Sequence, residues 1–282
     1  MTRPSPAEAA ALATITLAPM LARVEAWAAI NSGSGNLAAL AAMAAELAPA
    51  FAALGGTVAL VPPVPVAAID ATGVSRAVAH GDNLHVVRRA GAPVQVLLTG
   101  HMDTVFPADH PFQACRWRDA TTLNGPGTAD MKGGLAVMLA ALAAVEASPF
   151  AARLGYEVVI NSDEEVSSLG SGALLAAAAR RCHAGLTYEP ALPDGTLAGG
   201  RKGSGNFAAV VRGRAAHAGR EPEKGRNAVV AAADLALRLA ALVRDGVSVN
   251  PARIDGGGPN NIVPELAVLR FNVRPATPAD EA

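Results

Sequence analysis

A histidine and an aspartate lie two residues apart in Gly100-His101-Met102-Asp103-Thr104-Val105, directly after an apolar run at residues 94–99. The apolar run predicts a strand, and ligands of open α/β sheets bind beyond the carboxyl ends of the strands. An imidazole beside a carboxylate can supply a metal ligand and also the oxygen that orients it. The segment therefore predicts a metal site at the end of a strand.

Four further acidic residues, Asp130, Glu164, Glu165 and Glu189, each follow a strand-like segment or open a helix-like one. Each has an ordinary explanation on its own, because carboxylates also cap helices and favour helix N-termini. Together they match a hydrolytic two-metal centre, in which one carboxylate bridges ions about 3.5 to 4 Å apart and another moves a proton. Since neighbouring side chains diverge, one of Glu164 and Glu165 can bind metal while the other faces the attacking water.

The elements that must position these residues alternate between helix and strand. The turn at residues 31–35 is interpreted as a polar connector with capping residues, because it lacks the strand and the lysine of a phosphate-binding loop. The alternation predicts an α/β fold with a mixed, largely parallel sheet and helices on both faces. The expected helices are residues 6–29, 36–54, 133–146 and 169–181, and the expected strands are residues 57–60, 83–88, 94–99, 156–161 and 185–188.

The pattern changes after Pro190, where glycine-rich turns predict a hinge. We expect a strand at residues 206–212, a helix at 227–242, and strands at 247–254 and 266–273. This order is the first part of a ferredoxin-like α+β unit without its second helix and last strand. Because that leaves a sheet edge uncovered, we expect a shortened form of a longer chain, with one domain at residues 1–196 and an incomplete second domain at 197–282.

Bulk properties exclude some classes of function. The 282 residues carry a formal net charge of −1 with no basic stripe, so we expect neither a nucleic-acid partner nor a membrane partner. No apolar run reaches the roughly 18 residues of a membrane span, and the N-terminal segment lacks the pattern of a secretory signal. Cys115 and Cys182 form no close-spaced motif, so we expect two buried thiols and a cytoplasmic location.

Taken together, the motifs resemble those of the M20 metallopeptidases, a family that includes glutamate carboxypeptidase, acetylornithine deacetylase and succinyl-diaminopimelate desuccinylase. The resemblance runs from about residue 27 to the end, and its Asp-Met-Lys-Gly-Gly and Asp-Glu-Glu forms are most similar to the glutamate carboxypeptidase branch. It implies a zinc-exopeptidase-type catalytic domain at 1–196 with an inserted lid and dimerisation domain at 197–282. The matching segments are residues 100–105, 125–134, 161–165 with 168–172, 216–219 with 225–228, and 260–264 with 272–274.

Carried over residue by residue, the resemblance implies a pair of zinc ions for each full-length subunit, with cobalt as a substitute. Asp130 would be the bridging ligand. His101 and Glu189 would complete the protein ligands of one zinc, and Glu165 would bind the second. The family's second zinc takes a further histidine from near the C-terminus, and this sequence has no histidine after His217. We therefore expect an incomplete second metal site.

The resemblance also implies roles for residues that do not bind metal. Glu164 would be the general base, and Asp103 would hold the second ring nitrogen of the histidine ligand. His217 would lie near the oxyanion in the site of a neighbouring subunit, which implies a homodimer formed through the lid. Asn261 and Arg274 would lie near the substrate's carboxylate, a task that suits the planar fork of an arginine.

These expectations favour a zinc-dependent hydrolase that cleaves an amide bond next to a carboxylate-bearing residue of a small peptide. Two alternatives stay open: an N-acyl amino acid deacylase of the same family, and an inactive shortened paralogue that binds metal or a partner without turnover. The other histidines match no motif and are interpreted as structural or surface residues: His80, His85, His110 and His183.

Overall fold

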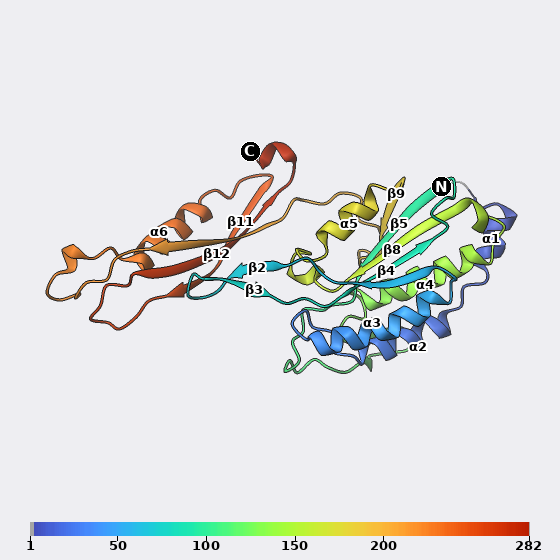
Figure 1. Ribbon diagram of the computed structural model, residues 1–282, viewed down its shortest axis with the longest axis horizontal. Coiled ribbons are helices and arrows are strands. Elements are labelled where there is room, and N and C mark those ends of the chain that lie inside the picture. Colours follow the sequence, from blue (N-terminus) through green and yellow to red (C-terminus); the bar gives the residue numbers. More distant parts are fainter. Residues whose placement is uncertain (1–2, 282) are drawn as a thin grey trace. The chain divides into compact units, whose positions relative to one another are not determined.

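The computed structural model describes residues 3–281, so the outer ends of the two expected domains, residues 1–2 and 282, lie outside it. Within the described residues the chain forms two compact units. The first unit consists of residues up to 66 together with 79–191, and the second consists of 67–78 together with the residues from 192 onward. Each unit has its own sheet and its own helices (Figure 1).

The first unit contains a five-stranded sheet in the order β1-β4-β8-β5-β9. Strand β8 pairs in parallel with β5, and β5 with β9, whereas β1 with β4 and β4 with β8 are antiparallel. The expected mixed sheet is confirmed, although its parallel and antiparallel pairings are equal in number and the sheet is not largely parallel. The strands are β1 (Thr57–Val61), β4 (Asn83–Arg88), β5 (Val94–His101), β8 (Leu154–Asn161) and β9 (Ala184–Thr187).

Helices cover both faces of this sheet, as expected (Figure 1). Helices α2 (Leu17–Ala28), α3 (Leu37–Ala52) and α4 (Lys132–Glu146) contribute to a core with the buried side chains of Val158 and Ile160. The alternate residue Val159 points to the opposite face, where Ala178 of α5 (Gly172–Ala179) packs against it. The period-two burial of β8 thus fixes its register between two helical layers.

The single helix expected at residues 6–29 is wrong. The structure has α1 (Pro6–Leu12) and α2, separated by residues 13–16. The Thr14 hydroxyl donates to the carbonyl of Ala11, and Thr16 adopts the extended backbone of an N-cap. Threonine and β-branched residues compete with the helix in this way, so the run Thr14-Ile15-Thr16 ends the first helix.

The second unit has a three-stranded antiparallel sheet in the order β10-β12-β11, with α6 packed on one face. The order in the chain is strand, helix, strand, strand, as the sequence predicts. Asn227 caps α6, because its Oδ1 accepts hydrogen bonds from the backbone of Val229 and Val230 at 3.0 Å. The elements are β10 (Gly205–Arg212), α6 (Ala228–Ala240), β11 (Val247–Gly256) and β12 (Leu266–Pro275).

A hairpin not expected from the sequence, β2 (Val66–Ile69) with β3 (Ser75–Val78), packs with the second unit. Arg270 donates to the carbonyl of Ile69 at 2.7 Å, and Arg212 donates to that of Gly73 at 3.3 Å. A second short hairpin, β6 (Arg116–Trp117) with β7 (Leu123–Asn124), lies in the first unit. No single helix among residues 3–281 is long and apolar enough to cross a membrane. Helices α1 and α2 have the required length and apolar character only when taken together, as a pair bent by 45°.

Candidate metal centre

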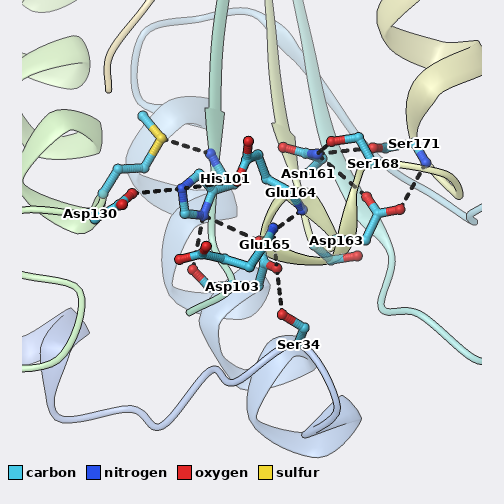
Figure 2. A network of polar contacts seen from close by, with 12 residues as sticks. Ser34, His101, Asp103, Asp130, Asn161, Asp163, Glu164, Glu165, Ser168 and Ser171 are labelled. Atoms are coloured by element: carbon cyan, nitrogen blue, oxygen red, sulfur yellow. Dashed lines mark hydrogen bonds and ion pairs between the residues drawn. The ribbon is translucent and has the colours of Figure 1, made fainter. Parts of the chain in front are cut away.

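His101, the last residue of β5, is fully buried and has carboxylates on both sides of its ring (Figure 2). Its Nδ1 lies 2.9 Å from the backbone oxygen of Asp103 and 3.2 Å from the Asp103 carboxylate. Two acceptors at Nδ1 keep a proton on that nitrogen. The other nitrogen, Nε2, lies 3.0 Å from Asp130, 3.8 Å from Glu189 and 4.0 Å from Glu164, so it points toward three carboxylates.

The loop before α4 presents Asp130, and the peptide bond between Asp130 and Met131 is cis. Lys132 anchors this loop, because its buried ammonium donates to the carbonyls of Trp27 at 3.0 Å and Ile30 at 2.8 Å. Burial lowers the pKa of Lys132 to about 8. A buried lysine bound to two carbonyls at the end of α2 joins the metal-site loop to the N-terminal helices.

Glu164 and Glu165 lie on a short 3-10 turn, Glu164–Val166, that follows β8. In the parallel pairing of β5 with β8, His101 is the partner of Asn161, so the two strand ends meet. The backbone N–H groups of Glu164 and Glu165 both donate to the carboxylate of Asp103 at 3.2 Å. Asp103 therefore contacts the histidine and the loop that carries the two glutamates.

Asp163 and Asn161 hold the other side of this loop, as Figure 2 shows. The Asp163 carboxylate accepts from the backbone N–H groups of Gly170 at 2.7 Å and Ser171 at 3.3 Å. The Asn161 amide donates to the hydroxyls of Ser168 at 3.1 Å and Ser171 at 2.9 Å. Neither residue has an expected role from the sequence, although both lie in the motif at residues 161–165.

Glu189 reaches the centre from the neighbouring strand, since it follows β9, which pairs in parallel with β5. Carboxylate and imidazole atoms within 4.8 Å of one another form two groups that could hold a metal. One group is His101 with Asp130 and Glu165, and the other is His101 with Glu164 and Glu189. The structure thus brings together all four expected metal ligands, along with Glu164 and Asp103.

The electrostatics of the centre favour a cation. Burial lowers the pKa of His101, but hydrogen bonds to Asp103 and Asp130 outweigh it and raise the pKa to about 11. Burial and the nearby Asp130 charge raise the pKa of Glu165 to about 7, and burial raises that of Glu189. Clustered carboxylates repel one another unless a positive charge lies among them. An imidazole nitrogen with several carboxylate oxygens is a donor set that suits zinc and similar divalent ions.

The remaining expected site residues belong to the second unit. His217 forms an isolated bridge with Ile262, and the carbonyl of Asn261 accepts from the N–H of Ala218 at 2.9 Å, so His217 and Asn261 lie on adjoining segments. The Nδ1 of His217 accepts from the backbone of Gly219 at 3.1 Å. Arg274, on β12, is exposed and donates to Asn272 at 3.0 Å.

The other histidines lie outside both groups of candidate ligands. His85 pairs with Glu157 at 2.8 Å, His183 accepts from the backbone of Gln95 at 3.0 Å, and His110 accepts from that of Phe112 at 3.1 Å. Both ring nitrogens of His80 are buried without a hydrogen-bond partner among the described residues.

Comparison with known proteins places the chain in a family. The sequence model of peptidase family M20/M25/M40 matches residues 97–267. Carboxypeptidase G2 of Pseudomonas sp. (strain RS-16) is 33% identical over 207 residues, which cover 71% of this chain and 49% of that protein. The chain belongs to the M20 peptidase family. The resemblance seen in the motifs is confirmed, and members of this family are metal-dependent.

Other members of the M20 family are similar over comparable lengths. Succinyl-diaminopimelate desuccinylase of Maricaulis maris (strain MCS10) is 33% identical over 215 residues, or 68% of this chain and 54% of that protein. The solved structure of a tripeptidase from Staphylococcus aureus subsp. aureus Mu50 is 25% identical, with a TM-score of 0.64 covering 94% of this chain and 68% of that one. The chain spans about half the length of the curated relatives that it matches.

Proposed function

We propose that this chain carries the metal centre of a hydrolase that cleaves an amide bond next to a carboxylate-bearing residue. The observation that carries the proposal is the environment of His101, whose Nδ1 is held by Asp103 while its Nε2 faces Asp130, Glu164 and Glu189. Carboxypeptidase G2 is one of the similar relatives, which supports the choice of a substrate with a free carboxylate.

The proposed ion is zinc, with Asp130 as the bridging ligand, His101 and Glu189 at one position, and Glu165 at the other. When bound, zinc supplies a Lewis acid that polarises the amide carbonyl and lowers the pKa of water. Glu164 takes a proton from the attacking water and delivers it to the leaving amine. Glu164 and Glu165 each lie in a group of candidate ligands with His101. We therefore propose, as a separate point, that Glu164 moves the proton and that Glu165 binds the metal.

The second unit supplies the proposed recognition groups. Asn261 and Arg274 hold the substrate's carboxylate, since a guanidinium binds a carboxylate through two parallel hydrogen bonds. His217 acts from a partner subunit of a homodimer and donates a hydrogen bond to the oxygen that gains charge during attack. We propose a cytoplasmic enzyme with small-molecule substrates.

The first test is the metal content of the chain. Among the described residues, both candidate groups share His101, and one imidazole nitrogen can bind one ion. After dialysis against a metal-free buffer, we expect elemental analysis to find one tightly held zinc and a second that is lost more easily. Two equally retained ions would overturn the assignment of an incomplete second position, and no zinc retention at all would overturn the metal centre.

The second test is hydrolysis of a dipeptide that ends in glutamate, its amidated analogue and an N-succinyl amino acid by the zinc-loaded chain. Preference for the dipeptide over its amide supports the carboxypeptidase proposal. A succinyl-diaminopimelate desuccinylase is 33% identical to the chain, which favours N-acyl amino acid deacylation as the second candidate, and faster cleavage of the succinyl compound would support it. Tight zinc binding without turnover of any of the three would favour the non-catalytic paralogue.

A further inference from the structure

The turn between α2 and α3, residues 31–35, is fastened to the segment that follows His101. Gly33 forms an isolated bridge with Thr104. The N–H of Thr104 donates to the carbonyl of Ser32 at 2.9 Å, and the N–H of Ser34 donates to that of Thr104 at 3.2 Å. These backbone contacts make the turn a neighbour of the metal centre.

Gly33 shows how closely the two segments approach. A Cβ atom added at this position would lie 2.3 Å from the carbonyl oxygen of Phe106, which is backbone and cannot move aside like a side chain. Asn31 fixes the same region, because its amide donates to the carbonyls of Phe106 at 3.3 Å and Pro107 at 3.2 Å. The turn is therefore held in one position relative to Asp103.

Within this turn, the hydroxyl of Ser34 donates to Oδ2 of Asp103 at 2.7 Å (Figure 2). The distance is shorter than the 3.2 Å of the contacts from Glu164, Glu165 and His101 to the same carboxylate. An O–H donor to an ionised carboxylate makes a strong, directional hydrogen bond. Asp103 is fully buried, so water cannot replace a lost donor without structural change.

We propose that Ser34 is a positioning residue of the metal centre. Its hydroxyl fixes the plane of the Asp103 carboxylate, and that carboxylate aligns the ring of His101 and the turn that carries Glu164 and Glu165. The inference rests on the proposed metal centre and extends it to the N-terminal segment, which supplies none of its ligands. Removing a group that orients a metal ligand typically lowers metal affinity by about 10- to 100-fold.

The test compares Ser34→Ala with Ser32→Ala in the metal-free chain. Ser32 lies in the same turn, and its buried hydroxyl has no hydrogen-bond partner among the described residues, so Ser32→Ala is a matched control. In calorimetric titration with zinc, we expect Ser34→Ala to bind the tighter ion about 10- to 100-fold more weakly and Ser32→Ala to bind like the wild type. Ser34→Thr keeps the hydroxyl and should restore most of the affinity.

A second readout needs no metal. We expect the backbone amides of Glu164 and Glu165 to exchange with deuterium faster in metal-free Ser34→Ala than in metal-free Ser32→Ala, because their shared acceptor is no longer fixed. If Ser34→Ala does not fold, Ser34→Cys fills the same space with a weaker donor and takes its place in both measurements.

The inference would be overturned if the tested variant matched Ser32→Ala in both zinc affinity and amide exchange. Absence of zinc binding by the wild-type chain would instead overturn the proposed metal centre, and the exchange measurement would still decide whether Ser34 positions the loop.

Discussion

Glu164 and Glu165 are neighbours in the chain, yet they belong to different groups of candidate ligands around His101. The two glutamates share one anchor, because their backbone N–H groups donate to the same carboxylate of Asp103. Their side chains diverge from that anchor, so one can remain free to move a proton. Replacing each carboxylate in turn by an amide identifies the glutamate that moves the proton.

Glu164→Gln should abolish turnover while leaving zinc affinity nearly unchanged, because an amide cannot accept the proton from water. The expected loss of kcat is about 10²- to 10⁴-fold or more. Glu165→Gln is the matched comparison and should lower zinc affinity together with kcat. Calorimetric zinc titration and kinetics on both variants measure the two effects. The opposite pattern would exchange the roles of the two residues.

Arg274→Ala should raise KM for a dipeptide that ends in glutamate by about 10- to 100-fold, the effect of losing charge-assisted hydrogen bonds. The amidated analogue should be affected far less, because an amide cannot accept the same bidentate pair. Arg253→Ala is the control, since Arg253 is an exposed arginine of the same sheet that pairs with Asp255. Steady-state kinetics on the acid and the amide decide the matter, and equal losses for both would mean that Arg274 supports the fold.

At the scale of elements, the buried ammonium of Lys132 connects the start of α4 to the end of α2. Its two carbonyl partners, those of Trp27 and Ile30, lie at the C-terminal end of α2, where a cation is favoured by the helix dipole. A charged residue that is 1% exposed is stable only with such partners.

Lys132→Met should lower the free energy of unfolding of the first unit by about 2 kcal/mol, because two buried carbonyls lose a charged donor. Urea denaturation followed by tryptophan fluorescence measures this. Arg153→Met is the control, because Arg153 is an exposed basic residue of the same unit, and its effect should stay within about 0.5 kcal/mol. Equal stability of Lys132→Met and the wild type would show that other contacts hold the loop.

The elements that carry the chemistry could be predicted from the sequence because apolar strands end in polar motifs. Residues 83–88 match β4, and the ends of β5, β8 and β9 carry His101, the two glutamates and Glu189 as expected. The pairing of β5 with β8 and β9, which brings these ends together, is a long-range property that periodicity does not contain. Lys132 and Ser34 bind partners about 70 or more residues away, so no local signal marks them.

Two local features were missed for different reasons. The break between α1 and α2 depends on competition between the Thr14 hydroxyl and the helix for a backbone carbonyl. A search for runs of apolar residues takes no account of this competition. The β2–β3 hairpin lacks a buried face of its own, since all four residues of β3 are exposed. Without an alternating apolar pattern, such a strand resembles a loop in the sequence.

On the scale of the whole molecule, the response to acid should begin in the first unit. Glu157 is buried, and its hydrogen bonds to the Arg181 guanidinium hold the pKa of its carboxyl below 4.5. Burial alone would raise this pKa, and a hydrogen bond to His85 lowers it further. A folded-state pKa below the unfolded one adds stability that is present above about pH 4.5 and is lost as the pH falls through the folded value.

Unfolding of the wild type should therefore become easier from about pH 5 downward, and Glu157→Gln should weaken that dependence. The variant should also be less stable at neutral pH by about 1 to 3 kcal/mol, because Arg181 loses its charged partner. Both tryptophans, Trp27 and Trp117, belong to the first unit, so their fluorescence follows it selectively. Glu46→Gln, a change at an exposed position of α3, serves as control and should keep the wild-type slope. An unaltered slope in Glu157→Gln would assign the acid sensitivity to other carboxylates.

The β2–β3 hairpin has a consequence for how this molecule can be cut or recombined. It precedes most of the first unit in the chain but packs with the second, where a Cβ on Gly73 would lie 2.8 Å from a methyl group of Val210. The second unit is therefore encoded in two separate stretches. A fragment that begins at residue 192 would leave apolar side chains of its sheet without their cover. To exchange this unit between relatives, residues 67–78 and the residues from 192 onward would have to be transferred together. A single crossover in the gene cannot transfer both stretches without the first-unit residues between them.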